Sequence, residues 1–148
     1  MSSKGAPKKR ACETLSATQA LGFALARTRN RLSALVPMAK SLHTQIIARA
    51  LELISEETHW TRCALARKKD WTICDWNDQK AFSYCAVGAL ARVAADLVGS
   101  TRQAFSLYLA VARHVLGANG RAHECLPTIN DQEGHLVILA MFRKALVL

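Results

Sequence analysis

The sequence predicts an all-α fold, a small helical domain of about five helices with a short irregular hairpin near residues 60–76. Apolar residues recur at helical spacing over most of the chain, and Ser, Asn or Gly stand where these stretches begin and end. The helical period fails between Thr58 and Asp78, where strand-favouring residues flank a polar turn. With 148 residues, 51% hydrophobic and 21% charged, the chain has the size and composition of one globular domain.

Three parts of the chain differ in composition. Residues 1–14 are polar and basic, so we expect a disordered basic tail there. Residues 15–40 predict a basic amphipathic helical arm, whose helix spans about 16–36 and ends at Pro37. Residues 41–148 are expected to fold as a single helical domain. The apolar stripe of the arm consists of Leu21, Leu25, Leu32 and Leu35.

Caps and breakers divide the predicted domain into helices. Ser41 is expected to cap a helix that runs to about Glu57. Asn77 and Asp78 are expected to cap the next helix, which Gly99 closes. The apolar stripe of this helix is predicted to contain Phe82, Cys85, Ala86, Ala89, Leu90, Val93 and Leu97.

Two further helices are predicted after Gly99. One follows Ser100 and stops at Gly117, and the last begins at Asn130 with Glu133 in the capping-box position. Their predicted buried stripes are Phe105, Tyr108, Leu109, Ala112 and Leu116 in the first, and Ile138, Met141, Phe142, Ala145 and Leu146 in the second.

The positive charge is concentrated near the start of the chain. The first 50 residues hold nine Lys and Arg against one acid, whereas residues 51–148 hold eleven against ten. A positive arm attracts any polyanion, and no recognition motif accompanies this one. Weak, non-specific nucleic-acid binding is therefore an alternative function. The predicted polyanion contacts are Lys8, Lys9, Arg10, Arg27 and Arg31.

The cysteines and the apolar runs bear on the compartment. Five cysteines make an odd count without a dense disulfide framework, which is typical of a reducing cytoplasm. Charged residues interrupt the apolar runs before they reach the roughly 20 residues of a membrane-spanning helix. We therefore expect a cytoplasmic protein without a membrane span.

Three segments form an ordered set of motifs. They read HWTRCALAR at 59–67, YCAVGAL at 84–90 and LPTIND at 126–131. Over about residues 45–147 the chain resembles DUF6197, a bacterial family of unknown function with many members in phage- or plasmid-linked genes. Cys63 stands where that family usually has Gly. The resemblance implies a bacterial accessory or mobile-element protein and carries no activity with it.

A zinc site is one chemistry that can be drawn from the sequence. His59 and Cys63 would share a face of a helix, and His123 and Cys125 offer a second pair. The pairs are far apart in the chain, and no Cys-x-x-Cys spacing is present. The sequence therefore predicts neither a metal nor a cofactor.

A thiol enzyme is another possibility, with Cys85, His135 and Asp131 as its nominated set. Cys85 is predicted to lie within an apolar helical stripe, where burial raises the pKa of a thiol. We therefore expect Cys85 to be structural, with Cys85→Ser costing more stability than Cys85→Ala. An enzyme with an undescribed site around Cys85, Asn130 and Asp131 is the second alternative function, and no catalytic residue is assigned.

Four residues are predicted to bind a ligand, namely Trp60, Arg67, Asn130 and Asp131. A helix start offers free backbone N–H groups, and a Trp ring offers an amphipathic surface. A helix cap and a core aromatic are the structural alternatives. The function predicted first is a small helical domain that acts by binding, either to a protein partner or to its own copy through the helix at 16–36.

Overall fold

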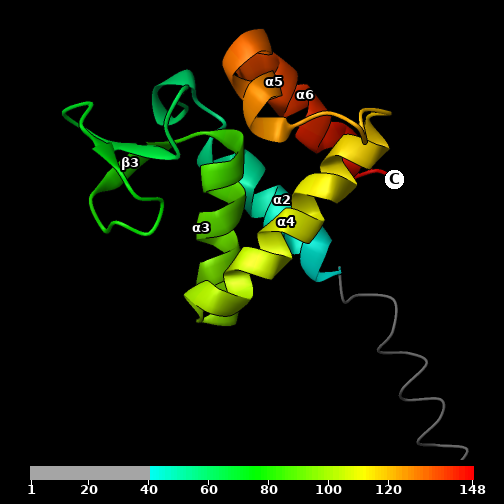
Figure 1. Cartoon of the computed structure of the whole chain (residues 1–148), viewed down its shortest axis with the longest axis horizontal. Helices are drawn as coiled ribbons and strands as arrows, with labels where there is room; N and C mark the ends of the chain where they lie inside the picture. Colours follow the sequence, from blue (N-terminus) through cyan, green and yellow to red (C-terminus); the bar gives the residue numbers. More distant parts are fainter. Residues whose placement is uncertain (1–40) are drawn as a thin grey trace, which may run out of the picture. The chain divides into compact units, whose positions relative to one another are not determined.

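The computed structural model describes residues 41–148. The chain divides into two units, Met1–Ala39 and Lys40–Leu148, and every element named below belongs to the second. The predicted tail at 1–14 and arm at 15–40 lie outside the described residues. The elements are α2 (Leu42–Leu53), the 3-10 turn η1 (Glu57–His59), β1 (Ala66–Lys68), β2 (Ile73–Cys74), β3 (Ala81–Tyr84), α3 (Ala86–Val98), α4 (Thr101–Ala118), α5 (Leu126–Glu133) and α6 (His135–Ala145) (Figure 1).

Serine side chains cap the starts of α2 and α4. Ser41 Oγ accepts a hydrogen bond from Thr44 N at 3.2 Å, and Ser100 Oγ accepts one from Gln103 N at 3.4 Å. Gly99 ends α3 at a φ of 66°, a left-handed conformation that glycine adopts without steric cost. These three predicted helix boundaries are confirmed.

The five helices α2 to α6 enclose the hydrophobic core of the described residues. Helix α3 packs against α2 and α4, and α6 packs against the same two helices, while α5 contacts α3 and α6 (Figure 1). Because each helix is amphipathic, its apolar face is removed from water only by this packing. The fully buried side chains include Ile46, Ile47, Leu90, Val111, Val115, Ile138 and Phe142.

The chain between α2 and α3 contains a three-stranded antiparallel sheet in the order β2-β1-β3. Ala66 in β1 pairs with Cys74 in β2 and with Tyr84 in β3. The hairpin predicted near residues 60–76 corresponds to β1 and β2, but the third strand was not predicted. The fold is therefore mostly helical with a small sheet, and the all-α prediction was wrong in this respect.

Asn77 and Asp78 do not cap a helix as predicted. Asp78 Oδ1 accepts a hydrogen bond from Lys80 N at 2.8 Å, so its side chain holds a turn that leads into β3. Phe82, which was expected on the helix, lies in β3. Pairing with β1 overrides the helical spacing of the apolar residues here, and α3 begins only after the strand has ended.

The last predicted helix is two helices in the structure. Helix α5 begins at Leu126, with Pro127 in its first turn, and Gly134 at a φ of 93° separates it from α6. Asn130 and Glu133 therefore lie inside α5 and do not form a capping box. The signals that sequence reasoning missed were Pro127, typical of a helix start, and Gly134, typical of a helix end.

Candidate functional site

Asn130, on α5, has 0% exposure and connects segments that are far apart in the sequence. Its Oδ1 accepts hydrogen bonds from Trp60 Nε1 at 2.8 Å and from Ala86 N at 3.0 Å. Its Nδ2 donates to Thr61 O at 3.1 Å and to Asp131 Oδ1 at 2.9 Å. An Asn amide can accept two hydrogen bonds and donate two, so the hydrogen-bonding capacity of the Asn130 amide is fully satisfied. We call these five residues the Asn130 network.

Arg67, on β1, joins the Asn130 network through Thr61. Its Nε donates to Thr61 Oγ1 at 3.0 Å, and its Nη1 donates to Trp71 O at 3.0 Å. The structure therefore brings together all four predicted ligand-binding residues, Trp60, Arg67, Asn130 and Asp131. Each of them hydrogen-bonds to protein atoms, and ligand binding by this set stays a prediction.

Trp60 is the aromatic centre of this cluster and is 7% exposed. The His135 ring packs against it, with 5.3 Å between ring centroids, and His135 Nε2 lies 2.6 Å from Ile54 O. His135 thus contacts Trp60 and Ile54. Cys85 and Asp131, the other members of the nominated catalytic set, line a hollow beside the start of α3.

Cys85 is the N-cap of α3, and it does not lie within the apolar stripe where the sequence placed it. Its Sγ accepts a hydrogen bond from Gly88 N at 3.3 Å, and the residue is 4% exposed. Burial raises the pKa of the thiol, and hydrogen bonds from the backbone N–H groups of Gly88 and Val87 oppose this only in part. The thiol therefore serves as a neutral helix cap.

The hollow beside α3 has a volume of about 300 Å³, and we call it the thiol hollow. Cys63 N donates to Asp131 Oδ1 at 2.9 Å, and Cys63 has a φ of 55°, in the left-handed region that favours glycine. Burial raises the pKa of the Asp131 carboxyl, but hydrogen bonds from Cys63 and Asn130 and the charge of Arg62 outweigh burial and lower it. Asp131 is therefore ionised. The lining residues are Cys63, Ala64, Leu65, Cys85, Pro127 and Asp131.

The residues of the zinc alternative lie in different surroundings. The His59 ring packs edge-on against Phe82 at 4.8 Å, and His123 is exposed. Cys63 lines the thiol hollow, whereas Cys125 lines a separate, apolar one. In the described part of the chain, no group of three or more His, Cys, Asp or Glu residues is placed to hold a metal ion.

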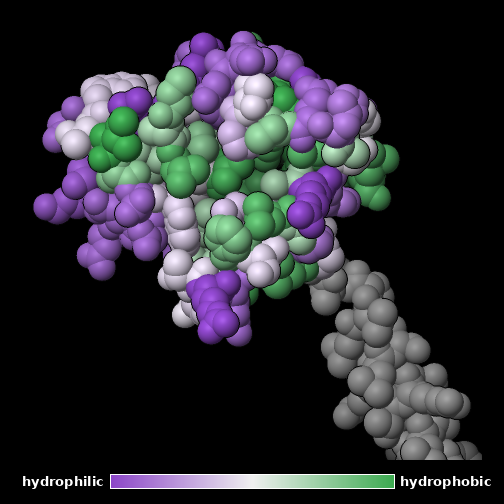
Figure 2. Space-filling model, in the orientation of Figure 1, coloured by the Kyte–Doolittle hydropathy of each residue, from purple (hydrophilic) through white to green (hydrophobic). Residues whose placement is uncertain are grey.

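The apolar hollow, with a volume of about 380 Å³, is formed by residues of α3, α4, α5 and the loop before α5. Figure 2 shows hydrophobic surface between α3 and α4, above the hydrophilic region where the two helices meet. Two charged residues, Arg113 and Glu124, stand among mostly apolar ones. The lining residues are Val87, Tyr108, Leu109, Ala112, Arg113, Leu116, Glu124, Cys125, Leu126 and Pro127.

Helix α4 was predicted to bury the stripe that starts at Phe105, and this was wrong for part of the stripe. Phe105 and Leu109 are 57% and 37% exposed. A neighbouring stripe, with Ala104, Val111 and Val115 fully buried, contacts the core instead. Sequence reasoning therefore found the apolar residues of α4 but missed that some of them remain on the surface.

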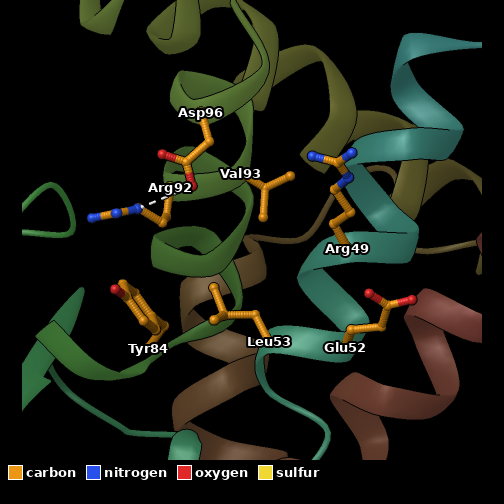
Figure 3. Close-up of a pocket in the computed structure, with 7 residues that line it drawn as sticks. All are labelled: Arg49, Glu52, Leu53, Tyr84, Arg92, Val93 and Asp96. Atoms are coloured by element: carbon orange, nitrogen blue, oxygen red, sulfur yellow. Dashed lines mark hydrogen bonds and ion pairs between the residues drawn. The ribbon is translucent and has the colours of Figure 1, made fainter. Parts of the chain in front are cut away.

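A third hollow, of about 520 Å³, lies between α2 and α3 (Figure 3). Leu53 and Val93 lie between its charged groups in this view. Arg92 Nε donates to Asp96 Oδ2 at 3.2 Å, and the ring of Tyr84 lies below them. Positive and negative side chains are balanced here, so the hollow favours neither sign of ligand charge. The charged residues are Arg49, Glu52, Arg92 and Asp96.

Comparison with known proteins places the described domain in a family. Residues 38–147 match the model of a family described as "Family of unknown function (DUF6197)". The chain belongs to the DUF6197 family. The match confirms the resemblance seen in the sequence over about residues 45–147 and begins slightly earlier. No curated protein and no solved structure matches the chain.

The DUF6197 match covers the Asn130 network and all three hollows. These features therefore belong to the family domain of this chain. Among the helices described for this DUF6197 protein, none is long and apolar enough to cross a membrane.

Proposed function

We propose that this DUF6197 chain is a binding module that takes an amphipathic helix of a partner protein into the apolar hollow. The observation that carries the proposal is the exposed stripe of α4. There Phe105 and Leu109 remain 57% and 37% exposed, and Leu109 lines a hollow of about 380 Å³. Exposed apolar side chains around a concave surface are typical of protein-binding sites, and an amphipathic helix fits a groove between helices.

The composition of the hollow supports a protein partner. Its lining is apolar apart from a few groups such as Arg113 and Glu124, which matches the apolar centre and charged surroundings of protein interfaces. The Phe105 ring packs edge-on against Tyr108 at 5.4 Å, so the two rings support each other beside the opening. Burying one large apolar side chain of a partner there contributes about 1.5–3 kcal/mol.

The charges at the hollow indicate the chemistry of the partner. Glu124 Oε1 accepts a hydrogen bond from Arg121 at 2.8 Å, whereas Arg113 is exposed and its side chain makes no hydrogen bond or ion pair with another described residue. Arg113 therefore favours a helix with a carboxylate beside its apolar face. Residues 16–36 hold three arginines and no acid, so a foreign helix fits this requirement better than that segment of a second copy.

A displayed library of amphipathic helical peptides tests the proposal. Peptides selected on the full chain should bind the Leu109→Glu variant at least about tenfold more weakly, a loss of ~1.4 kcal/mol. Leu136→Glu is the matched control, because Leu136 is also an exposed leucine on a helix, at 78%, but is not part of the apolar hollow. Arg113→Glu should shift the selected sequences from acidic to basic residues.

Two results would contradict this function. Peptides that bind wild type and Leu109→Glu equally would place the binding surface elsewhere. A dimer in light scattering that Leu109→Glu dissolves would show that the hollow holds a second copy and no foreign helix. Self-association through the helix at 16–36 is a separate prediction, and Leu32→Glu in that segment should abolish it without affecting peptide binding.

Nucleic-acid binding is the second candidate function, and the hairpin between β1 and β2 favours it. The Trp71 side chain is 62% exposed. Its backbone is held in place, because Trp71 O accepts a hydrogen bond from Arg67 Nη1 at 3.0 Å and Trp71 N donates one to Lys68 O at 2.9 Å. Lys69, two residues earlier in the same turn, is exposed. An exposed Trp can stack on a base while a nearby Lys meets a phosphate. The basic residues predicted to assist are Lys8, Lys9, Arg10, Arg27 and Arg31.

Fluorescence anisotropy with labelled single-stranded DNA and RNA tests this candidate. The log of the affinity should fall linearly with the log of the salt concentration. Trp71→Ala should weaken binding about tenfold, as expected for the loss of one base stack. Phe105→Ala removes another exposed aromatic ring and serves as the control. Equal binding by Trp71→Ala and wild type would reject the hairpin as a nucleic-acid contact.

The proposal also includes a biological setting. We place the binding module in the cytoplasm of a bacterium, as an accessory or mobile-element protein. The odd number of cysteines supports the reducing compartment, and the bacterial setting follows from what the resemblance in the sequence implies.

A further inference from the structure

Two thiols line the same small cavity. Cys63 and Cys85 both contribute to the thiol hollow, which has a volume of about 300 Å³. Both are free thiols, with Cys63 exposed and Cys85 buried. They belong to different segments, since Cys63 precedes β1 and Cys85 precedes α3. Their shared cavity is thus a consequence of the fold and not of neighbouring positions in the chain.

Backbone contacts hold the two segments against each other. Cys85 N donates to Leu65 O at 3.1 Å, two residues along the chain from Cys63. A Cβ atom added to Gly88 would lie 1.9 Å from Leu65 O, so the segment rests directly on the first turn of α3. Cys63 itself is held by the 2.9 Å hydrogen bond from its N–H to Asp131. The position of Cys63 near α3 is therefore fixed by the main chain.

We propose that Cys63 and Cys85 form a reversible dithiol–disulfide site that small disulfides, such as oxidised glutathione, oxidise. Cys63 first loses its proton to solvent, and its thiolate attacks one sulfur of the small disulfide, giving a mixed disulfide and releasing one small thiolate. That thiolate takes the proton of Cys85. The Cys85 sulfur then attacks the Cys63 sulfur and displaces the second small thiolate, which takes a proton from solvent. One small disulfide is reduced to two thiols, and the protein loses two hydrogen atoms.

Exposure sets the order of the two steps. Cys63 is open to solvent and can meet a bulky disulfide. Cys85 is 4% exposed and caps α3, so it is poorly placed to react with a reagent that must diffuse in. An intramolecular attack on a sulfur already held in the thiol hollow needs no such access. The new bond would close a loop that contains β1, β2 and β3.

Glutathione redox buffers test the site on the full-length chain, with intact mass and peptide mapping as readouts. Wild type should lose two hydrogen atoms and yield one peptide pair that links Cys63 to Cys85. Cys85→Ser should stop at the mixed disulfide and carry one glutathione on Cys63, because no second thiol displaces it. Cys63→Ser should leave Cys85 reduced. The controls Cys74→Ser and Cys125→Ser should behave as wild type.

A second probe measures the proximity of the thiols without oxidation. A trivalent arsenical that bridges two thiols should bind reduced wild type with one equivalent, and Cys63→Ser and Cys85→Ser should each lose this binding. Wild type that keeps glutathione on Cys63 as stably as Cys85→Ser does would overturn the proposal. A disulfide from Cys63 to Cys12, Cys74 or Cys125, or unchanged arsenical binding by Cys85→Ser, would overturn it as well.

Discussion

Replacing Asn130 with Asp tests the Asn130 network directly, because the change keeps the shape of the side chain and removes only its donors. A carboxylate can still accept hydrogen bonds from Trp60 Nε1 and Ala86 N, which lie at 2.8 and 3.0 Å. It cannot donate to Thr61 O or Asp131 Oδ1, which now accept at 3.1 and 2.9 Å. Thr61 O and Asp131 Oδ1 therefore each lose a hydrogen-bond donor, and the introduced carboxylate lies next to the carboxylate of Asp131.

The contacts give the expected size of the effect. Two lost hydrogen bonds cost about 2 kcal/mol together. Burial of a charge at a site with 0% exposure adds to this, and we expect a total loss of about 3–5 kcal/mol in the free energy of unfolding near pH 8. Burial and the Asp131 charge should raise the pKa of the introduced carboxyl in the folded state. A raised folded-state pKa means that stability is retained at low pH and lost as the pH rises through that pKa.

Urea unfolding at about pH 5 and about pH 8 measures this loss by linear extrapolation. Gln132→Glu is the matched control, because Gln132 is exposed on the same helix and undergoes the same amide-to-carboxylate change. The control should cost less than about 0.5 kcal/mol. The role assigned to the amide would be refuted if Asn130→Asp lost no more unfolding free energy than Gln132→Glu, or if its loss became smaller as the pH rises.

The remaining predictions concern backbone fit and capping, and thermal or urea unfolding checks each of them. Gly88→Ala should cost about 3 kcal/mol, because the new Cβ would lie 1.9 Å from Leu65 O, whereas Gly117→Ala, with nothing within 4 Å, should stabilise α4 by about 0.5–1 kcal/mol. If Gly88→Ala cost no more stability than a surface substitution, the segment at Leu65 would have to be able to move away from α3. Cys63→Gly should stabilise the fold by about 1 kcal/mol, since it relieves the φ of 55°, and a loss of stability would contradict this. Cys85→Ala should cost roughly 1 kcal/mol more than Cys85→Ser, because a hydroxyl can replace the thiol as the cap and Ala cannot, and the opposite order would disprove the capping role.

The sequence predicted those parts of the fold that depend on local chemistry. Ser41, Ser100 and Gly99 set helix ends through their own side chain or their own backbone freedom, and all three were found from the sequence. The third strand depends instead on pairing between Ala66 in β1 and Tyr84 in β3, which are distant in the chain. Apolar spacing over 82–97 is compatible with a helix until that pairing is known.

The candidate site was predictable in part for the same reason. Trp60, Arg67, Asn130 and Asp131 were selected together, and the structure joins them in one cluster. The reason given for Asn130 was wrong, because it was taken as a helix cap and instead hydrogen-bonds to two other segments, the one at Trp60 and Thr61 and the start of α3 at Ala86. For Cys85 the expected burial was correct. The structure leads us to predict the opposite order of the Ser and Ala variants, since Gly88 N–H offers a partner that no sequence pattern reveals.

The hydrogen bonds of Asn130 also affect how long the folded state survives. They link it to Trp60, Thr61 and Ala86 across sequence separations of 70, 69 and 44 residues. Contacts of this length require large loops to close first, so they form late in folding. Substitutions of Asn130 should therefore speed unfolding while leaving the refolding rate nearly unchanged. A single amide on the short helix α5 then governs the lifetime of the native domain far more than the rate at which the domain is reached.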